Sequence, residues 1–400
     1  MFLYIDPGTG SILLSLIVGF ILSLKDFFID LYYKTISLFI KNKYKGTHDF
    51  TDELVFFSEG KKYWKVFKPI LECLENMNVK FIFLSADLND PGLLFNSKKS
   101  SSHYIGNMNQ AVRVLNKLKA TMCVTTTPQL DILEWKYSKN VKHYCYIYHS
   151  PIDIHSYKKF AFDYYDSILC TSNYQLKNIR QLEIIRNSKK KILKKTGCTY
   201  FDLSISKTAT SNNDYILIAP TWGDRSFFKN SGELLVQVLL KHGYKIIYRP
   251  HPQSWISDIE LLNQIKLKFG NNKMFSIDKA IDNSISLSKS KAMITDISSG
   301  IIYDVAFLYK IPVIAVNFEW DDGGYESSSL NVSASSNYLL KDYGKLIMED
   351  ELNRIDKIIE EALNVEITKE IMDKHIFNFK NSSKFASNQI ISIFNNIKNQ

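Results

Sequence analysis

Apolar and polar residues alternate along most of the chain in the way expected of strands and helices that follow one another in turn. Short runs rich in β-branched and aromatic residues end at polar or proline-containing segments, and stretches with a helical period lie between them. This alternation predicts parallel sheets with covering helices. In the first half the predicted strands are residues 54–57, 80–84, 122–125, 143–148 and 167–170, and the predicted helices are residues 66–77 and 108–119.

A polar stretch over residues 204–214 interrupts the pattern before a second series of strands begins. The chain has 400 residues, which exceeds the usual size of one domain. Two α/β domains joined near residue 210 are therefore expected. The second series of predicted strands comprises residues 215–219, 245–248, 291–295 and 312–316.

These patterns set the expected domain boundaries. We expect an N-terminal Rossmann-like domain over residues 46–208 and a C-terminal one over residues 209–375. A helix predicted within residues 376–400 has an apolar face that suits packing on either domain.

The first 45 residues have a different pattern, which predicts a membrane anchor followed by an interfacial helix. Residues 7–24 carry no charge, no basic residue precedes their apolar run and no small-residue cleavage site follows it, which favours an uncleaved anchor over a signal peptide. Residues 25–41 place apolar side chains on one helical face, typical of a helix at a membrane surface or of one docked on the protein's own core. Lysines follow the apolar run, so the domains are expected to face the cytoplasm.

Composition narrows the class of protein. A hydrophobic fraction of 45% and a charged fraction of 23% argue against a disordered scaffold or a polytopic membrane protein. The net charge of +9 suits an anionic membrane surface or a phosphate-rich substrate, although a solvated lysine-rich surface gives the same total. The five cysteines are widely spaced without a CxxC pair, so we expect reduced thiols and no zinc site.

The segment KAMITDISSG over residues 291–300 carries the strongest local signal. It predicts a buried strand that ends at Asp296, with Ser298 and Ser299 placed where a helix begins. Hydroxyls, free backbone N–H groups and the helix dipole would converge there on an anion such as phosphate. Ligands of open α/β sheets bind at this end of the strands, whereas plain N-capping by serine is the alternative.

A second strand exit carries the sequence RPHP over residues 249–252. Arg249 and His251 are two positions apart and point to the same side, while two prolines stiffen the exit. Both side chains can donate hydrogen bonds to phosphate oxygens. Together with the serine segment, this motif predicts a diphosphate site.

A third exit, after residues 215–219, presents Thr221, Trp222, Asp224 and Arg225 at the same edge of the predicted sheet. These residues are candidates to support a donor. Trp222 suits either stacking on a ligand or packing within the protein.

The first half contributes His149, which follows a predicted strand beside the expected cleft between the domains. A histidine can take a proton from a hydroxyl near neutral pH, although core histidines are common. Asp153 and His155 are nearby alternatives. The sequence contains neither the GxSxG elbow of a serine hydrolase nor the GxxxxGK[ST] loop of an NTPase.

Three of these motifs together resemble a known family. The strings APTW (219–222), RPHP (249–252) and TDISSGIIYDVAFLYKIPVI (295–314) resemble, in this order and spacing, the C-terminal half of CDP-glycerol:poly(glycerophosphate) glycerophosphotransferases. These are the teichoic-acid polymerase and primase enzymes. The resemblance covers roughly residues 140–330.

The resemblance implies a GT-B architecture, with two Rossmann-like domains facing across a cleft, the acceptor on the N-terminal domain and the nucleotide held mostly by the C-terminal one. It also implies membrane association. His149 in YHSP matches the base in the family's WHG(T/S)P segment. The implied donor-phosphate residues are Arg249, His251, Ser298, Ser299 and Gly300, braced by Asp296 and supported by Thr221, Asp224 and Arg225.

Some positions depart from the family's pattern. Tyr148 stands where tryptophan is usual, Ser150 replaces the glycine after the histidine, and Gly223 breaks a WR pair for which Arg225 can compensate. These departures bear on the alcohol of the donor more than on its phosphates.

The expected activity is a transfer at the cytoplasmic membrane face that needs no metal or cofactor. A glycerol phosphate or related alditol phosphate would move from a CDP-activated donor to a lipid-linked cell-surface polymer, and no nucleic acid is expected as a partner. The alternatives are a GT-B glycosyltransferase that uses a sugar nucleotide in capsule or lipopolysaccharide synthesis, a nucleotide-sugar 2-epimerase, and an inactive binding or scaffold protein.

Overall fold

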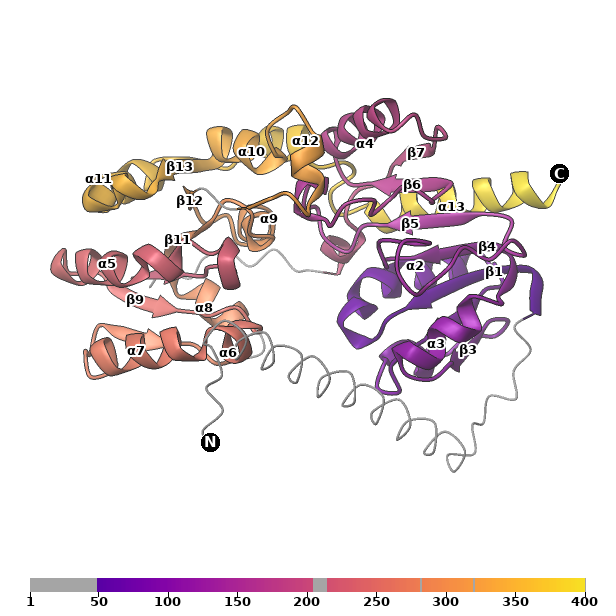
Figure 1. Ribbon diagram of the computed structural model, residues 1–400, viewed down its shortest axis with the longest axis horizontal. Coiled ribbons are helices and arrows are strands. Elements are labelled where there is room, and N and C mark those ends of the chain that lie inside the picture. The colour runs from indigo at the N-terminus through magenta and orange to yellow at the C-terminus, as the bar shows by residue number, and fades with distance from the viewer. Residues whose placement is uncertain (1–48, 204–213, 281–282, 319–320, 400) are drawn as a thin grey trace, which may run out of the picture. The chain divides into compact units, whose positions relative to one another are not determined.

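The computed structural model describes residues 49–203, 214–280, 283–318 and 321–399, which form two parallel sheets covered by helices (Figure 1). This confirms the predicted two-domain α/β, GT-B-like fold. The predicted anchor and interfacial helix over residues 1–45 lie outside the described residues. Within those residues, no helix combines the length and the apolar character that a membrane span requires.

The N-terminal sheet has seven strands in the order β3-β2-β1-β4-β5-β6-β7, and every neighbouring pair is parallel. The central strands are buried on both faces, as parallel strands between helical layers must be. The strands are β1 (Asp49–Ser58), β2 (Ile82–Ser85), β3 (Ser101–Tyr104), β4 (Lys119–Thr125), β5 (Tyr144–Ile147), β6 (Ser167–Cys170) and β7 (Ile192–Lys195). Three α-helices, α2 (Trp64–Asn76), α3 (Met108–Leu115) and α4 (Asn173–Ile185), belong to this half, with 3-10 turns η1 (Lys61–Tyr63), η2 (Pro91–Leu94), η3 (Ile154–Ser156) and η4 (Thr199–Asp202).

The C-terminal sheet has six parallel strands in the order β10-β9-β8-β11-β12-β13. The strands are β8 (Tyr215–Ile218), β9 (Lys245–Tyr248), β10 (Phe275–Ile277), β11 (Ser290–Asp296), β12 (Val313–Asn317) and β13 (Gly344–Met348). Its helices are α5 (Phe228–Lys241), α6 (Ser254–Ser257), α7 (Ile259–Phe269), α8 (Ser284–Ser288), α9 (Ile301–Asp304), α10 (Ser335–Tyr343), α11 (Ile355–Leu363) and α12 (Lys369–His375), with a π-helical turn η6 (Val305–Tyr309) and 3-10 turns η5 (Gly223–Arg225), η7 (Glu326–Ser329) and η8 (Glu349–Arg354).

The last helix, α13 (Ser382–Lys398), packs on α2 and η4 of the N-terminal half. Asp202 in η4 caps its first turn, because the carboxylate accepts hydrogen bonds from the N–H groups of Ser382 at 3.1 Å and Ser383 at 2.6 Å. The chain therefore returns from the C-terminal half to the N-terminal sheet, which settles the packing that the sequence left open.

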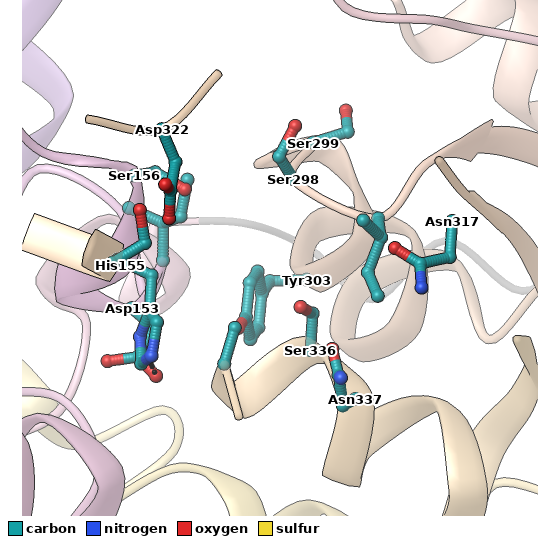
Figure 2. Close-up of a pocket in the computed structure, with 14 residues that line it drawn as sticks. Asp153, His155, Ser156, Ser298, Ser299, Tyr303, Asn317, Asp322, Ser336 and Asn337 are labelled. Carbon is teal, nitrogen blue, oxygen red and sulfur yellow. Dashed lines mark ion pairs between the residues drawn. The ribbon is translucent and has the colours of Figure 1, made fainter. Parts of the chain in front are cut away.

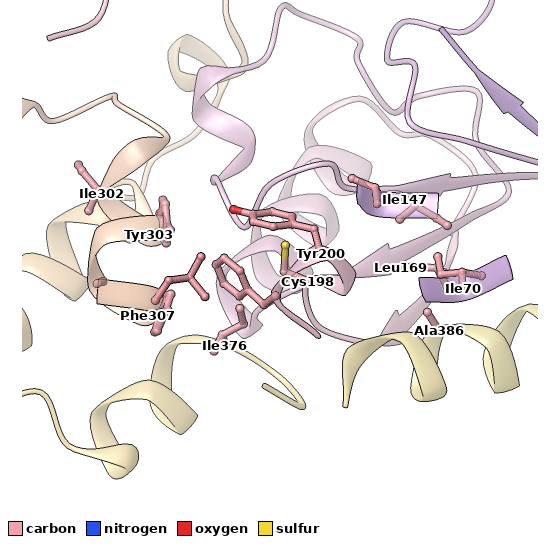
Figure 3. Close-up of a cluster of buried hydrophobic side chains, with 14 of the residues drawn as sticks. Ile70, Ile147, Leu169, Cys198, Tyr200, Ile302, Tyr303, Phe307, Ile376 and Ala386 are labelled. Carbon is pink, nitrogen blue, oxygen red and sulfur yellow. The ribbon is translucent and has the colours of Figure 1, made fainter. Parts of the chain in front are cut away.

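One cluster of buried apolar side chains runs through both halves (Figure 3). Tyr200 of η4 lies between the N-terminal sheet and the helical segment over residues 301–309. The ring of Phe201, the next residue, packs 5.8 Å from that of Phe307 in this segment. The Tyr200 hydroxyl donates a hydrogen bond to the carboxylate of Asp304 in α9. Because apolar packing and a buried polar contact coincide there, the two halves share a continuous core at this point.

A second connection between the halves is formed by residues 324–326, which bind the segment 157–161 of the N-terminal half. The backbone N–H of Lys159 donates to Gly324 O at 3.1 Å, and that of Glu326 donates to Tyr157 O at 2.8 Å. The Glu326 carboxylate is fully buried and forms an ion pair with Arg186, which also pairs with Asp163. We call this set of contacts the interdomain latch.

The latch leads to a prediction about stability. The change Arg186→Met removes the cation but leaves Glu326 buried, and an uncompensated buried charge typically costs about 3–5 kcal/mol. We expect the free energy of unfolding in urea to fall by about that amount. Arg354→Met is the matched control, because the Arg354–Glu351 pair is exposed and should contribute about 1 kcal/mol or less. Equal losses in the two variants would contradict the role assigned to the latch.

Candidate functional site

A cavity of about 510 Å³ lies where the loops after β8, β9 and β11 meet the loop after β5. All four loops follow the carboxyl end of a parallel strand, which is the edge where ligands bind in such sheets. The cavity therefore combines side chains from both halves. Its lining includes eight of the ten site residues that the family resemblance implies, namely His149, Thr221, Arg225, Arg249, His251, Ser298, Ser299 and Gly300.

Asp296 lies beneath the cavity wall and is fully buried. Its carboxylate accepts hydrogen bonds from the N–H of Thr221 and, at 2.6 Å, from the N–H of Phe227. The Thr221 hydroxyl lies 2.9 Å from the same carboxylate. Asp296 thus ties the loop over residues 220–227 to the end of β11. Burial raises its pKa to about 6, although these hydrogen bonds oppose the shift.

Asp224 does not line the cavity, in contrast to the supporting residues Thr221 and Arg225. Its side chain is 91% exposed and forms an ion pair with Lys229 at 2.6 Å. Gly223 places the backbone in the left-handed region, with a φ of 63°, and the following residues turn outward as η5. This turn separates Asp224 from Arg225, which lines the cavity.

Arg249 lines the cavity, and its guanidinium is held by Asp278 at the end of β10. Burial of Asp278 acts against its ionisation, but hydrogen bonds from Ser286 and the Ala280 N–H, together with Arg249, lower the pKa of this carboxyl. The ion pair keeps Asp278 charged and fixes the orientation of the arginine. A fixed guanidinium can bind phosphate without losing side-chain freedom.

His251 has a defined tautomer. Its Nδ1 accepts a hydrogen bond from the Gln253 N–H at 3.1 Å, so Nε2 carries the proton of the neutral ring. Burial and the nearby Arg225 lower the pKa of His251. The ring is inclined by 30° to that of Trp222, with centroids 6.2 Å apart. His251 can therefore donate one hydrogen bond to an anion in the cavity while it remains neutral.

The loop after β11 presents two serines to the cavity before the helical segment 301–309 begins. The Ser299 N–H donates to Asp296 O at 3.0 Å, which folds the loop back on the strand. The Ser298 hydroxyl is buried and has no hydrogen-bond partner among the described residues. A buried hydroxyl without a hydrogen-bond partner destabilises the fold unless a ligand or a water molecule forms a hydrogen bond with it.

His149 lines the same cavity on the side of the N-terminal half. Its ring packs edge-on against Tyr63 and Tyr157, with centroids 5.5 and 6.1 Å away. Burial, reinforced by Lys62 and Lys65, lowers the pKa of His149 to about 4. The Nδ1 atom has no hydrogen-bond partner in the part of the chain that the structure describes. His149 is therefore a neutral imidazole at physiological pH, oriented by aromatic packing.

Asp304 is a further acidic residue at the cavity that motif analysis did not single out. Burial raises the pKa of this carboxyl, which accepts the hydrogen bond from Tyr200. A carboxylate within the apolar run IIYDVAFLY was the available signal in the sequence. No sequence pattern pointed to Lys62 and Lys65, because they lower the pKa of His149 only through their proximity to it in the folded structure.

Comparisons with known proteins place the fold. No protein-family model matches the sequence, and no curated protein matches it either. Among solved structures, a variant of the wall teichoic acid polymerase TagF is similar, with a TM-score of 0.51, 17% identity, and coverage of 94% of this chain and 99% of that chain. MnaA of S. aureus, solved with UDP, has a TM-score of 0.57 and 13% identity, covering 86% of this chain and 97% of its own.

The UDP-GlcNAc 2-epimerase of Methanocaldococcus jannaschii is also similar, with a TM-score of 0.51, 14% identity, and coverage of 85% of this chain and 99% of that one. The likeness to TagF confirms, at the level of the fold, the resemblance to teichoic-acid polymerases that the motifs predicted. At these identities the likeness identifies the architecture, and the chemistry has to be argued from the cavity.

The bracing role of Asp296 generates a prediction. In Asp296→Asn the side chain keeps one oxygen, so one of the two N–H groups of Thr221 and Phe227 loses its acceptor. We expect the free energy of unfolding to fall by about 1–3 kcal/mol at neutral pH. The control Asp224→Asn changes an exposed residue and should leave the free energy of unfolding almost unchanged.

The pH dependence of the free energy of unfolding provides a second test of Asp296. Its pKa of about 6 in the folded protein exceeds the usual value of 3.8, so the folded state holds the proton more tightly than the unfolded state. The contribution of this group to stability is therefore greatest at low pH and declines as the pH rises from about 4 to 6. Asp296→Asn should abolish this decline, and an unchanged pH profile would count against a buried titrating Asp296.

Proposed function

We propose that the protein transfers glycerol phosphate, or a related alditol phosphate, from a CDP-activated donor to a lipid-linked cell-surface polymer. The observation that carries this proposal is the cavity itself, which is lined by a neutral histidine from one half and, from the other half, by side chains that are able to bind phosphate. A group-transfer enzyme needs a base for the acceptor and a cradle for the leaving nucleotide.

The C-terminal edge of the cavity suits the donor diphosphate. Arg249 offers a fixed guanidinium, His251 a defined N–H donor, and the loop of Ser298, Ser299 and Gly300 offers hydroxyl and backbone groups. A Cβ added at Gly300 would lie 3.7 Å from Ile152 and 3.9 Å from Ser150, in ordinary van der Waals contact, so Gly300 lies where the two halves approach each other. Arg225 adds a second cation next to Trp222. These groups would stabilise negative charge on the departing nucleotide.

His149 is assigned the role of the general base, which takes the proton of the acceptor hydroxyl. In the proposed reaction the acceptor hydroxyl oxygen attacks the outer phosphorus of the donor, and its proton passes to the neutral imidazole. The bond from that phosphorus to the bridging oxygen breaks, and its electron pair leaves with cytidine monophosphate. The new bond is a phosphodiester, so atoms and charge balance without a further reactant.

The membrane part of the proposal rests on the sequence. The uncharged residues 7–24 and the lysines after them favour an enzyme attached to the cytoplasmic membrane with its domains facing the cytoplasm, where nucleotide donors and lipid-linked acceptors meet. The net charge of +9 is consistent with an anionic membrane surface.

A second candidate is a sugar-nucleotide enzyme of the same fold, either a transferase for capsule or lipopolysaccharide or an epimerase. The observation that favours it is the TM-score of 0.57 to MnaA, whose structure was solved with UDP. The same phosphate cradle would serve a sugar nucleotide, with the anomeric carbon as the reacting centre.

Product analysis separates the two candidates. We expect the purified full-length protein, incubated with membrane lipid extract, to release CMP from CDP-glycerol or CDP-ribitol. His149→Ala should reduce this release by about 10²-fold or more, because the base is lost. His251→Ala should do so through weaker donor binding and leaving-group stabilisation. Exposed His242 supplies the control His242→Ala. Turnover of sugar nucleotides alone would refute the alditol assignment.

The low pKa of His149 makes a prediction about pH. The neutral imidazole is the active form, so kcat/KM should stay independent of this group down to a pH near 4 and fall below it. A bound diphosphate brings negative charge that favours the protonated ring, so the acid limb of kcat should lie at higher pH than that of kcat/KM.

A lysine variant tests the cause of that low pKa. Lys62→Met removes a cation that holds the pKa of His149 down, so the acid limb of kcat/KM should move to higher pH. Lys68→Met, at a lysine paired with Glu72 on α2, should leave it in place. A limb near 6.5 in the unmodified enzyme, or one that both variants move equally, would exclude His149 as the titrating base.

A further inference from the structure

A second, smaller chamber adjoins the diphosphate cavity. It has a volume of about 180 Å³ and shares four lining residues with that cavity, Ile152, Ser156, Ser298 and Ser299. Figure 2 shows its two sides, with Asp153, His155 and Asp322 on one and Asn317, Ser336 and Asn337 on the other. Whatever fills this chamber therefore lies directly beside the serine loop proposed to hold phosphate.

The walls of the chamber suit an uncharged group with several hydroxyls. Asn317, Asn337 and Ser336 offer both donors and acceptors, while Ile152 and Tyr303 supply apolar surface for carbon atoms. The hydroxyls of Ser298 and Ser327 are buried and have no hydrogen-bond partner within the described ranges. Two hydroxyls without hydrogen-bond partners in one chamber indicate that a polar ligand forms hydrogen bonds with them.

The charges in the chamber disfavour an anion. His155 Nδ1 lies 3.2 Å from Asp153 Oδ2, and His155 Nε2 donates to Val332 O at 2.7 Å. Burial opposes protonation of this ring, but Asp153, the Val332 carbonyl and Asp322 outweigh it and raise the pKa of His155. Two carboxylates face this one imidazole, so the net local charge is negative whether or not the ring is protonated. A phosphate or carboxylate would be repelled there.

We propose that this chamber binds the polyol carried on the outer phosphate of the donor and thereby selects the alditol that is transferred. This inference rests on the proposed function and extends it to substrate specificity. Asp322 and Asn337 are then specificity residues, which contact the hydroxyls of the transferred group and not its phosphates.

The position of His149 supports the donor's polyol over the acceptor as the occupant. His149 lines the diphosphate cavity but not the smaller chamber. In transfer at phosphorus, the polyol stays attached to the phosphate throughout, and the bonds that form and break lie on other oxygens. A polyol held beyond the serine loop would leave the face of the phosphorus near His149 open to the acceptor hydroxyl. In sugar transfer, by contrast, the reacting carbon belongs to the group itself and has to approach the base.

Two substitutions test the chamber without touching the phosphate cradle. Asn337→Leu keeps the approximate volume and removes the amide, and Asp322→Asn removes the charge at constant shape. By titration calorimetry, each should weaken CDP-glycerol about tenfold, as expected for a lost hydrogen bond to a buried polar group, and leave the affinity for CDP unchanged. Asn396→Leu, the same change at an exposed position of α13, should alter neither affinity.

The controls separate failure of this inference from failure of the proposed function. An unmodified protein that binds neither CDP nor CDP-glycerol would overturn the proposed function. If the unmodified protein binds both, equal weakening of CDP and CDP-glycerol in the chamber variants, or no change in either, would overturn the chamber as the polyol site. Loss of affinity for UDP-GlcNAc relative to UDP, with CDP-glycerol unaffected, would assign the chamber to a sugar and refute the alditol. Unfolding midpoints of all variants show whether any loss reflects stability.

Discussion

The buried carboxylate of Asp296 is the contact on which the geometry of the cavity depends. It lies at the end of β11 and accepts hydrogen bonds from the N–H groups of Thr221 and Phe227 in the loop after β8. The same strand end leads directly into Ser298 and Ser299. One side chain thus fixes the loops of two neighbouring strands relative to each other. A carboxylate accepts from several N–H groups at once, which explains why an acidic residue is found at a fully buried position.

The cavity also needs the two halves to be held together, and two buried contacts do this. Tyr200 binds Asp304 within the shared apolar core, and Arg186 pairs with Glu326 in the interdomain latch. Both lie next to the site, since Asp304 lines the larger cavity, and Ser156 and Ser327, which directly adjoin the two latch segments, line the smaller chamber. A buried ion pair adds little stability over apolar packing of the same volume but fixes one geometry, so the Arg186–Glu326 pair contributes to the alignment of the two halves.

Sequence patterns predicted the parts of the fold that depend on local chemistry. The apolar strands β8, β9 and β11 and the polar residues at their ends are readable because period and position are local properties. The edge strands β3 and β7 escaped prediction, since SSHY and ILKK are too polar and too short to be distinguished from loops. The Arg186–Glu326 pair joins residues 140 positions apart, and no local pattern encodes such a contact. The turn that carries Asp224 away from the cavity likewise depends on the φ of Gly223.

The environment of His149 determines how much of the proposed catalysis depends on the base and how much on stabilisation of the leaving nucleotide. With a pKa of about 4, the free imidazole is a weak base and accepts a proton readily only once negative charge lies nearby. The donor diphosphate supplies that charge, so binding of the donor would itself prepare the base. In the proposed reaction a larger share of the barrier would then be lowered by Arg249, His251 and the serine loop, which would face the leaving nucleotide. This division explains why packing against Tyr63 and Tyr157 suffices to orient His149, and no carboxylate is needed to hold it.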